Sequence, residues 1–196
     1  MSHPVLPEAE PLSHVGAGPH GALVIHGYTG NPSSMRELAE AFVAAGLHVE
    51  MPRLPGHGTH IDDMIPTGWP DYVAEAEAAY QRLAARADKV VVAGLSMGGA
   101  LTLRMGASHP EIAGLICINA ATAPIGLEDM VPIMNEMLDG GDEVAPGIGS
   151  DIADPDVTES AYEGARRRAV RRVEGVVRPR LGAGQDGWCS HGRRSI

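Results

Sequence analysis

The sequence predicts an α/β fold in which a mainly parallel sheet carries helices on both faces. Short apolar, β-branched runs alternate along the chain with longer stretches whose apolar residues recur at helical spacing. The predicted strands are Ala22–His26, Leu47–Met51, Val90–Ala93 and Gly114–Asn119. Because strands that alternate with helices form parallel sheets, we expect chemistry at the carboxyl ends of these strands.

Helical patterns follow each of the first three predicted strands. Residues 1–20, which are rich in Pro, Gly and His, precede the first strand as an extended lead-in. Ser34 and Glu37 have the spacing of a capping box for the first helix. Trp69-Pro70 opens the second helix, and the third covers Ala100–Ala107.

The segment Gly94-Leu95-Ser96-Met97-Gly98 stands where the third predicted strand passes into its helix. G-x-S-x-G at such a junction is typical of a nucleophile elbow, a sharp turn that lifts the serine hydroxyl above the sheet. Gly94 and Gly98 suit this turn because neither has a Cβ atom. We therefore expect Ser96 at a strained backbone dihedral and interpret it as a nucleophile rather than as part of a glycine-rich turn.

Length and composition predict one soluble domain. The chain has 196 residues, of which 44% are hydrophobic and only 4% aromatic, so its core must be mostly aliphatic. Because no apolar run reaches membrane-spanning length and no secretory signal is visible, we expect a cytoplasmic protein. Cys117 and Cys189 are too few for a disulfide framework, and Cys117 is interpreted as a packing residue in a buried strand.

Charge is distributed unevenly along the chain. Residues 1–160 contain 6 basic and 22 acidic side chains, a net charge of −16, whereas residues 161–196 contain 9 basic and 3 acidic ones, a net charge of +6. An inversion this abrupt marks a boundary in composition near residue 160.

Four motifs occur in one order along the chain: HGYTGN at 26–31, RLPGHG at 53–58, Trp69-x-Asp71 at a helix start, and GLSMGG at 94–99. With this combination the sequence resembles the α/β-hydrolase carboxylesterases and monoacylglycerol lipases from about residue 20 to residue 163.

The resemblance implies an α/β-hydrolase-like fold with Ser96 as the nucleophile of acyl transfer. It also implies an oxyanion hole formed by the backbone N–H groups of Tyr28 and Met97. The implied substrates are small carboxylic esters or monoacylglycerols, and the implied reaction needs no metal and no organic cofactor.

These observations divide the chain into four parts. The lead-in is 1–20, the hydrolase core with its elbow is 21–122, a lid- or cap-like segment is 123–160, and an Arg-rich tail is 161–196. Within the third part, the Met-rich stretch Leu127–Leu138 is interpreted as a lid that covers the serine and lines an acyl pocket, with ordinary core packing as the alternative.

The acid and the base that the family places after later strands are not identifiable in this chain. Val173–Val177 is the nearest match to a further strand, but it is short and interrupted by glycine. Residues 164–196 resemble a GC-rich coding sequence read out of frame, and we hypothesise that the chain leaves its ancestral frame near Glu163. We therefore expect a sheet truncated after the fourth recognisable strand, strongly reduced turnover, and self-association through an uncovered sheet edge.

Other histidines and carboxylates are weaker candidates for the missing partners. His26 is interpreted as a structural member of the oxyanion loop, and His109 as a cation at a helix C-terminus. His191 has the right chain order for the base but no strand to carry it. Three carboxylates qualify as the acid by chain order alone: Asp154, Asp156 and Asp186.

Two further kinds of site are considered and not expected. His57 and His60, with Asp62 and Asp63 in the polar loop behind them, lack the helical face that aligns zinc ligands. From residue 163 onward the Arg-rich tail contains no aromatic residue besides Trp188, so we expect no nucleic-acid function. The alternatives to an ester hydrolase are a non-catalytic hydrolase-like fragment or binding module, and acyl transfer to an acceptor other than water.

Overall fold

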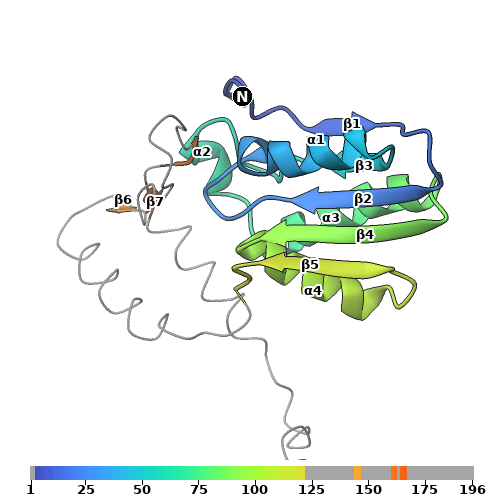
Figure 1. Cartoon of the computed structure of the whole chain (residues 1–196). Coiled ribbons are helices and arrows are strands. Elements are labelled where there is room, and N and C mark those ends of the chain that lie inside the picture. The colour runs from blue at the N-terminus through green and yellow to red at the C-terminus, as the bar shows by residue number, and fades with distance from the viewer. Residues whose placement is uncertain (1–2, 122–143, 147–159, 163, 167–196) are drawn as a thin grey trace, which may run out of the picture.

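The computed structural model describes residues 3–121, 144–146, 160–162 and 164–166. At its centre is a five-stranded sheet in the order β1-β3-β2-β4-β5 (Figure 1). The strands are β1 (Leu12–His14), β2 (His20–Ile25), β3 (His48–Met51), β4 (Lys89–Leu95) and β5 (Gly114–Ile118). Strands β2 to β5 run parallel, and β1 pairs antiparallel with β3.

A second, antiparallel sheet consists of β6 (Val144–Pro146) and β7 (Gly164–Arg166). It lies off the edge at which the parallel strands of the main sheet end, near the short helix α2 (Ile61–Met64) (Figure 1). The carboxyl ends of β2 and β4 point toward this side of the molecule.

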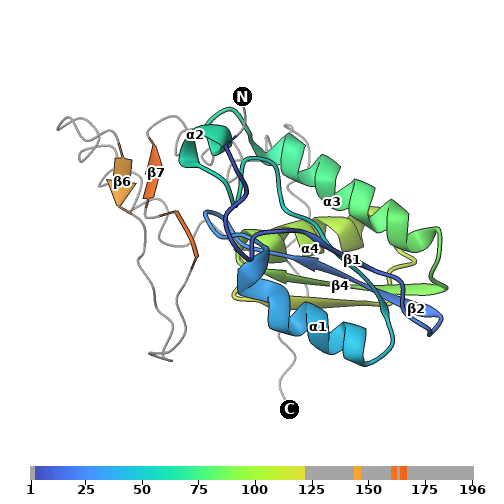
Figure 2. The ribbon, with the colours of Figure 1, turned by 90° about the horizontal axis from the view of Figure 1, so that it is seen from above.

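Helices cover both faces of the main sheet (Figure 2). A 3₁₀ turn, η1 (Pro32–Met35), leads into α1 (Arg36–Ala44), which packs on one face. Helices α3 (Trp69–Ala84) and α4 (Met97–Ser108) pack on the other. The predicted fold class, a mainly parallel sheet between layers of helices, is therefore confirmed.

Alternating side chains of β2 supply the core on both faces. Leu23 and Ile25 belong to the cluster that contains residues of α3 and α4, and Val24 belongs to the cluster that contains residues of α1. All three are completely buried. Burial of side chains of this size contributes about 1.5–3 kcal/mol each, which makes β2 the centre of the hydrophobic core.

The four predicted strands and the helix start at Trp69 are found within two residues of their expected positions. The lead-in over 1–20 contains a strand, β1, that the sequence analysis does not distinguish. The loop with Asp62 and Asp63 contains a helical turn, α2, where only a polar loop is expected. Cys117 is exposed, so its interpretation as a buried packing residue is wrong.

The capping box expected from Ser34 and Glu37 is also wrong, because the 3₁₀ turn η1 comes before α1. The N-cap of this turn is Asn31, whose Oδ1 accepts the N–H of Ser33 at 2.9 Å. The Ser34 hydroxyl donates to the carbonyl oxygen of Asn31 at 2.9 Å. Helix α1 itself begins after Met35, which makes no side-chain capping bond.

One buried carboxylate joins β1, β3 and α3. Glu50 is only 2% exposed and accepts hydrogen bonds from the Ser13 hydroxyl at 2.5 Å, from Arg82 Nε at 2.9 Å and from an Arg86 guanidinium N–H at 2.6 Å. Burial alone raises the pKa of Glu50, but these three donors outweigh it and hold the pKa below its ordinary value of 4.5. The ionised Glu50 carboxylate therefore ties α3, through Arg82, to strands β1 and β3.

Several expectations concern parts of the chain outside the described residues. These are the lid over Leu127–Leu138, the candidate strand Val173–Val177, the acid candidates Asp154, Asp156 and Asp186, and His191 in the tail. Among the helices that the structure describes, none has the length and apolar character needed to cross a bilayer.

Candidate active site

Ser96 lies between the end of β4 and the start of α4, with φ 55° and ψ −113°. A positive φ is uncommon outside glycine and costs about 1–3 kcal/mol, so such a backbone is kept only where its surroundings enforce it. The strained dihedral expected for a nucleophile elbow is present. Ser96 is the N-cap residue of α4, but its side chain makes no capping hydrogen bond.

Glycines on both sides of Ser96 allow the sharp turn. A Cβ atom on Gly94 would overlap the carbonyl oxygen of Gly98 and would lie 2.5 Å from Thr102 Oγ1. One on Gly98 would overlap the carbonyl oxygen of Ile25, at the end of β2. The first turn of α4 is therefore in direct backbone contact with both β4 and β2.

The same close packing brings the loop after β2 to the elbow. A Cβ atom on Gly27 would lie 3.4 Å from both the Ser96 Cβ and the Leu95 carbonyl oxygen. Tyr28, the next residue, therefore starts its loop beside the serine.

Backbone hydrogen bonds to the far side of the elbow hold it in place. The Ser96 N–H donates to the Ile118 carbonyl oxygen at 2.9 Å, and the Ser96 carbonyl oxygen accepts the N–H of Ala121 at 3.2 Å. Strand β5 and the residues after it thus fix Ser96 from one side, while the loop after β2 bounds it on the other.

Two backbone amides beside Ser96 are not engaged by other described residues. The Tyr28 N–H donates to no described residue. Met97 is the first residue of α4, where an amide has no partner within the helix. Such N–H groups can donate hydrogen bonds to an external acceptor, and the helix N-terminus adds a favourable field for negative charge there.

Two buried histidines lie beneath this loop. His26 is completely buried, and its Nδ1–H donates to the Gly27 carbonyl oxygen at 2.9 Å while its Nε2 accepts the Leu54 N–H at 3.1 Å. Burial lowers the pKa of His26 to about 3, and the nearby His57 ring contributes in the same direction. A neutral ring with both nitrogens bonded has the structural role expected for His26.

His57 is the second buried ring. Its Nδ1–H donates to the Pro55 carbonyl oxygen at 2.9 Å, and its ring lies 5.2 Å from that of His26 and 5.2 Å from that of Tyr72. Its Nε2 is buried without a hydrogen-bond partner among the described residues. Burial lowers the pKa of His57 to about 4. In sequence His57 stands with His60, whereas in the structure it packs against His26.

His109 is the C-cap residue of α4, a position that favours a positive charge, and its ring also pairs with two carboxylates. Its Nε2 is 2.8 Å from Glu77 and its Nδ1 is 3.2 Å from Glu111. Burial lowers its pKa, but the two carboxylates outweigh this effect, so the pKa lies above its ordinary value of 6.5. The ring nitrogens of His26 and His109 are thus engaged elsewhere, and His57 is held by Pro55.

One group of described residues has the composition of a metal site: His3, His60 and Asp62, whose candidate ligand atoms lie within 4.8 Å of one another. All three are exposed. The two imidazole rings are stacked, with centroids 4.3 Å apart and planes inclined by 28°. Because imidazole binds metals through lone pairs in the ring plane, stacked rings do not point at one common ion. Asp63 instead accepts from both the backbone and the ring of His3.

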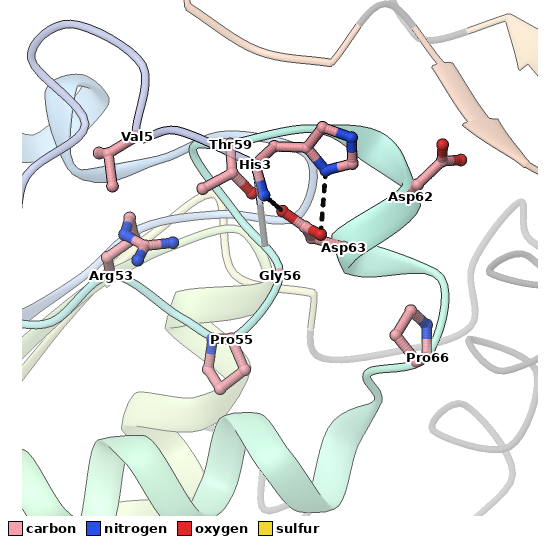
Figure 3. A pocket seen from close by; sticks show the side chains of 9 residues that line it. All are labelled: His3, Val5, Arg53, Pro55, Gly56, Thr59, Asp62, Asp63 and Pro66. Atoms are coloured by element: carbon pink, nitrogen blue, oxygen red, sulfur yellow. Dashed lines mark hydrogen bonds and ion pairs between the residues drawn. The ribbon is translucent and has the colours of Figure 1, made fainter. Parts of the chain in front are cut away.

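A pocket of about 480 Å³ opens next to this group. The N-terminal residues His3 and Val5 form one wall, and the loop from Arg53 to Gly56 and the first turn of α2 form the others (Figure 3). His3 and Asp63 are joined by hydrogen bonds across it (Figure 3). Ser96 does not line this pocket, so the pocket and the elbow are separate features.

The geometry of strand, elbow and helix defines the class of protein, and comparison with known proteins agrees with it. A family description, the alpha/beta hydrolase family, matches residues 22–192. The chain belongs to this family, which confirms the fold and the resemblance inferred from the four motifs.

Two relatives bear the names of a lipase and an esterase. The chain is 47% identical over 163 residues to "Thermostable monoacylglycerol lipase" of Bacillus sp. (strain H-257), covering 82% of this chain and 62% of the relative. It is 29% identical over 100 residues to "Carboxylesterase" of Bacillus subtilis (strain 168), covering 50% of this chain and 40% of the relative. The chain thus spans less than two thirds of the length of the curated relatives it matches.

A solved structure from work on LipS and LipT, two metagenome-derived lipolytic enzymes, superposes with a TM-score of 0.77 at 41% sequence identity. The superposition covers 89% of this chain and 70% of that one. At this identity the likeness extends beyond the general fold to the sequence.

Proposed function

We propose that this chain carries the nucleophile and the oxyanion hole of a carboxylic-ester hydrolase, with Ser96 as the nucleophile. The observation that carries the proposal is the backbone of Ser96, which has a positive φ at the end of β4 and packs against Gly27. A plain glycine-rich turn does not need a non-glycine residue in this conformation, so the strain at Ser96 favours a functional reason.

In the proposed reaction the Ser96 Oγ forms a bond to the carbonyl carbon of the ester. The electron pair of the carbonyl π bond moves to the oxygen, and the resulting oxyanion accepts hydrogen bonds from the Tyr28 and Met97 N–H groups. Donors that are fixed beforehand stabilise this charge without reorganisation, and the loss of one such donor typically lowers the rate 10²–10³-fold. A base takes the serine proton. When the tetrahedral intermediate collapses, the ester C–O bond breaks and the base gives this proton to the departing alcohol oxygen, and water then hydrolyses the acyl-serine to the free acid and the serine.

The substrate class we propose is monoacylglycerols and small carboxylic esters. Support comes from the names of the two Bacillus relatives, a monoacylglycerol lipase and a carboxylesterase. Acyl transfer to an acceptor other than water uses the same first step, and product analysis distinguishes it from hydrolysis.

We also propose that turnover by this chain is low. No histidine that the structure describes is hydrogen-bonded to Ser96. Three rings are engaged elsewhere: both ring nitrogens of His26 and His109 have partners, and His57 donates to Pro55. A serine without a base is a poor nucleophile at neutral pH, and the residual acceleration from oxyanion stabilisation and binding is about 10³–10⁴-fold over water. The alternative is a non-catalytic binding module with this fold, in which Ser96 forms no bond to an ester carbonyl carbon.

The first prediction compares the chain with its Ser96→Ala variant in the hydrolysis of p-nitrophenyl butyrate. We expect slow hydrolysis by the unchanged chain, no rate above background for Ser96→Ala, and an intact mass raised by one butyryl group only where Ser96 is present. Ser108→Ala, the same change at an exposed position of α4, is the control and should retain the full rate. Equal rates for the unchanged chain and Ser96→Ala would rule out the esterase and leave the binding module.

A further inference from the structure

Three residues from far along the chain, 160–162, contact the loop that begins at Tyr28. The Tyr162 N–H donates to the Thr29 carbonyl oxygen at 3.0 Å. The side chain of Asn31 donates to the carbonyl oxygen of Ser160, and also to its hydroxyl at 3.1 Å. These contacts join positions about 130 residues apart in sequence, so local propensity does not account for them.

The phenol of Tyr162 reaches a second loop. Its hydroxyl donates to the Gly56 carbonyl oxygen at 2.8 Å and accepts the N–H of Thr59 at 3.1 Å. One tyrosine therefore bonds loop 28–31 through its amide and loop 56–59 through its hydroxyl. Both the donor and an acceptor capacity of the hydroxyl are used, which fixes the ring in one orientation.

The backbone of loop 28–31 needs support from outside. Thr29 has φ 61°, a left-handed conformation that is unfavourable for a threonine, whereas Gly56 in the second loop adopts its φ of 77° without strain. Each of these residues offers its carbonyl oxygen to Tyr162. The strained conformation of Thr29 directly follows the Tyr28 amide, so the constraint on Thr29 limits how the Tyr28 N–H can turn.

We infer that Tyr162 is a positioning residue for the proposed oxyanion hole: its amide and its phenol clamp loop 28–31 against loop 56–59 and thereby hold the Tyr28 N–H beside Ser96. The inference rests on the proposed function of Ser96 and Tyr28. Tyr162 acts through the loop, and no contact of its own with a substrate is required.

The test is Tyr162→Phe, which removes the two hydroxyl bonds and keeps both the ring and the backbone bond to Thr29. The matched control is Tyr80→Phe. Tyr80 lies on helix α3, outside both loops, and its hydroxyl likewise donates a hydrogen bond, to Glu111 at 2.9 Å. Both variants are assayed at a temperature where circular dichroism shows them folded. We expect Tyr162→Phe to lower kcat at least about 10-fold with KM changed less than about threefold, because the oxyanion forms only in the transition state.

A merely structural role would give a different result, a lower thermal midpoint with kcat kept in the folded protein. A kcat for Tyr162→Phe within about twofold of the unchanged chain would therefore overturn the inference. The same holds for an equal fall of kcat in Tyr80→Phe, because that loss would not be specific to the clamp.

Amide measurements test the clamp independently of turnover. In Tyr162→Phe we expect faster hydrogen exchange at the Thr59 N–H, which loses its acceptor, and a shifted amide resonance for Tyr28. An unchanged Tyr28 resonance overturns the inference. If the unchanged chain and Ser96→Ala hydrolyse esters equally, the proposed function fails, and these amide data still decide whether Tyr162 orders the loop.

Discussion

At the scale of single residues, burial sets the protonation state of two neighbouring histidines. His26 is completely buried, and both of its ring nitrogens are in hydrogen bonds. His57 is completely buried against the rings of His26 and Tyr72. These contacts come from distant parts of the chain, and no local pattern in the glycine-rich loop around His57 encodes them.

The burial of His57 predicts acid sensitivity. In the folded chain the pKa of His57 is about 4, whereas in the unfolded chain it has its ordinary value of 6.5. The unfolded state therefore binds more protons between these values, and stability falls as the pH falls from 6.5 toward 4, by up to about 1.4 kcal/mol per pH unit for each such histidine. We expect His57→Asn to make this dependence shallower by that amount, as measured by urea unfolding at several pH values.

His109→Asn is the control with the opposite sign. Because the pKa of His109 is raised in the folded chain, its contribution is complete below pH 6.5 and is lost as the pH rises through the folded-state pKa. Removing it should change the slope above pH 6.5 and leave the slope between about 5.5 and 6.5 intact, since its partners Glu77 and Glu111, which have lowered pKa values, titrate below that range. A His57→Asn slope identical to that of the unchanged chain in the acid range would contradict the assignment of His57.

At the scale of elements, the elbow is the feature that the sequence predicts best. Its glycines, its serine, the strand before it and the helix after it are contiguous, so the local pattern specifies the local geometry. Strand β1 has only three residues and forms against β3, 34 or more positions further on, so nothing in its own sequence distinguishes it from an extended lead-in. The hydrogen bonds of Tyr162 to two loops more than 100 positions away could not be predicted either, because nothing in the sequence around Tyr162 specifies such distant partners.

The elbow also predicts a large difference between two glycine substitutions. Gly94→Ala forces a Cβ atom into the backbone of α4, and we expect it to lower the free energy of unfolding by about 3 kcal/mol. Gly114→Ala in β5 is the matched control, because its Cβ atom would meet only Val91 Cγ1 at 3.7 Å, and it should change stability by less than about 1 kcal/mol. Urea unfolding measures both, and similar midpoints would show that the close packing of Gly94 is not what the structure indicates.

At the scale of the whole molecule, β5 is the part of the sheet that departs most from a buried core. In the part of the chain that the structure describes, β5 pairs with β4 alone. Three of its large apolar residues are exposed, Leu115 by 41%, Ile116 by 40% and Ile118 by 37%. An edge with free backbone groups and apolar side chains is a template for pairing with another strand.

We therefore expect the chain to self-associate through β5 as its concentration rises. Ile116→Lys places a charge on this edge and should shift the mass measured by light scattering after size exclusion toward the monomer. Val15→Lys, at a 70% exposed position between β1 and β2, is the control and should leave the mass distribution as it is. If the chain stays monomeric at every concentration, β5 does not mediate self-association.

The positive φ of Ser96 has a consequence for anyone who engineers this chain. Glycine adopts that conformation without the penalty that a residue with a Cβ atom incurs, so we expect Ser96→Gly to raise the free energy of unfolding. Directed evolution that selects on melting temperature alone would therefore favour glycine at position 96 and remove the hydroxyl that we propose as the nucleophile. A screen for ester cleavage in every round would select against that loss.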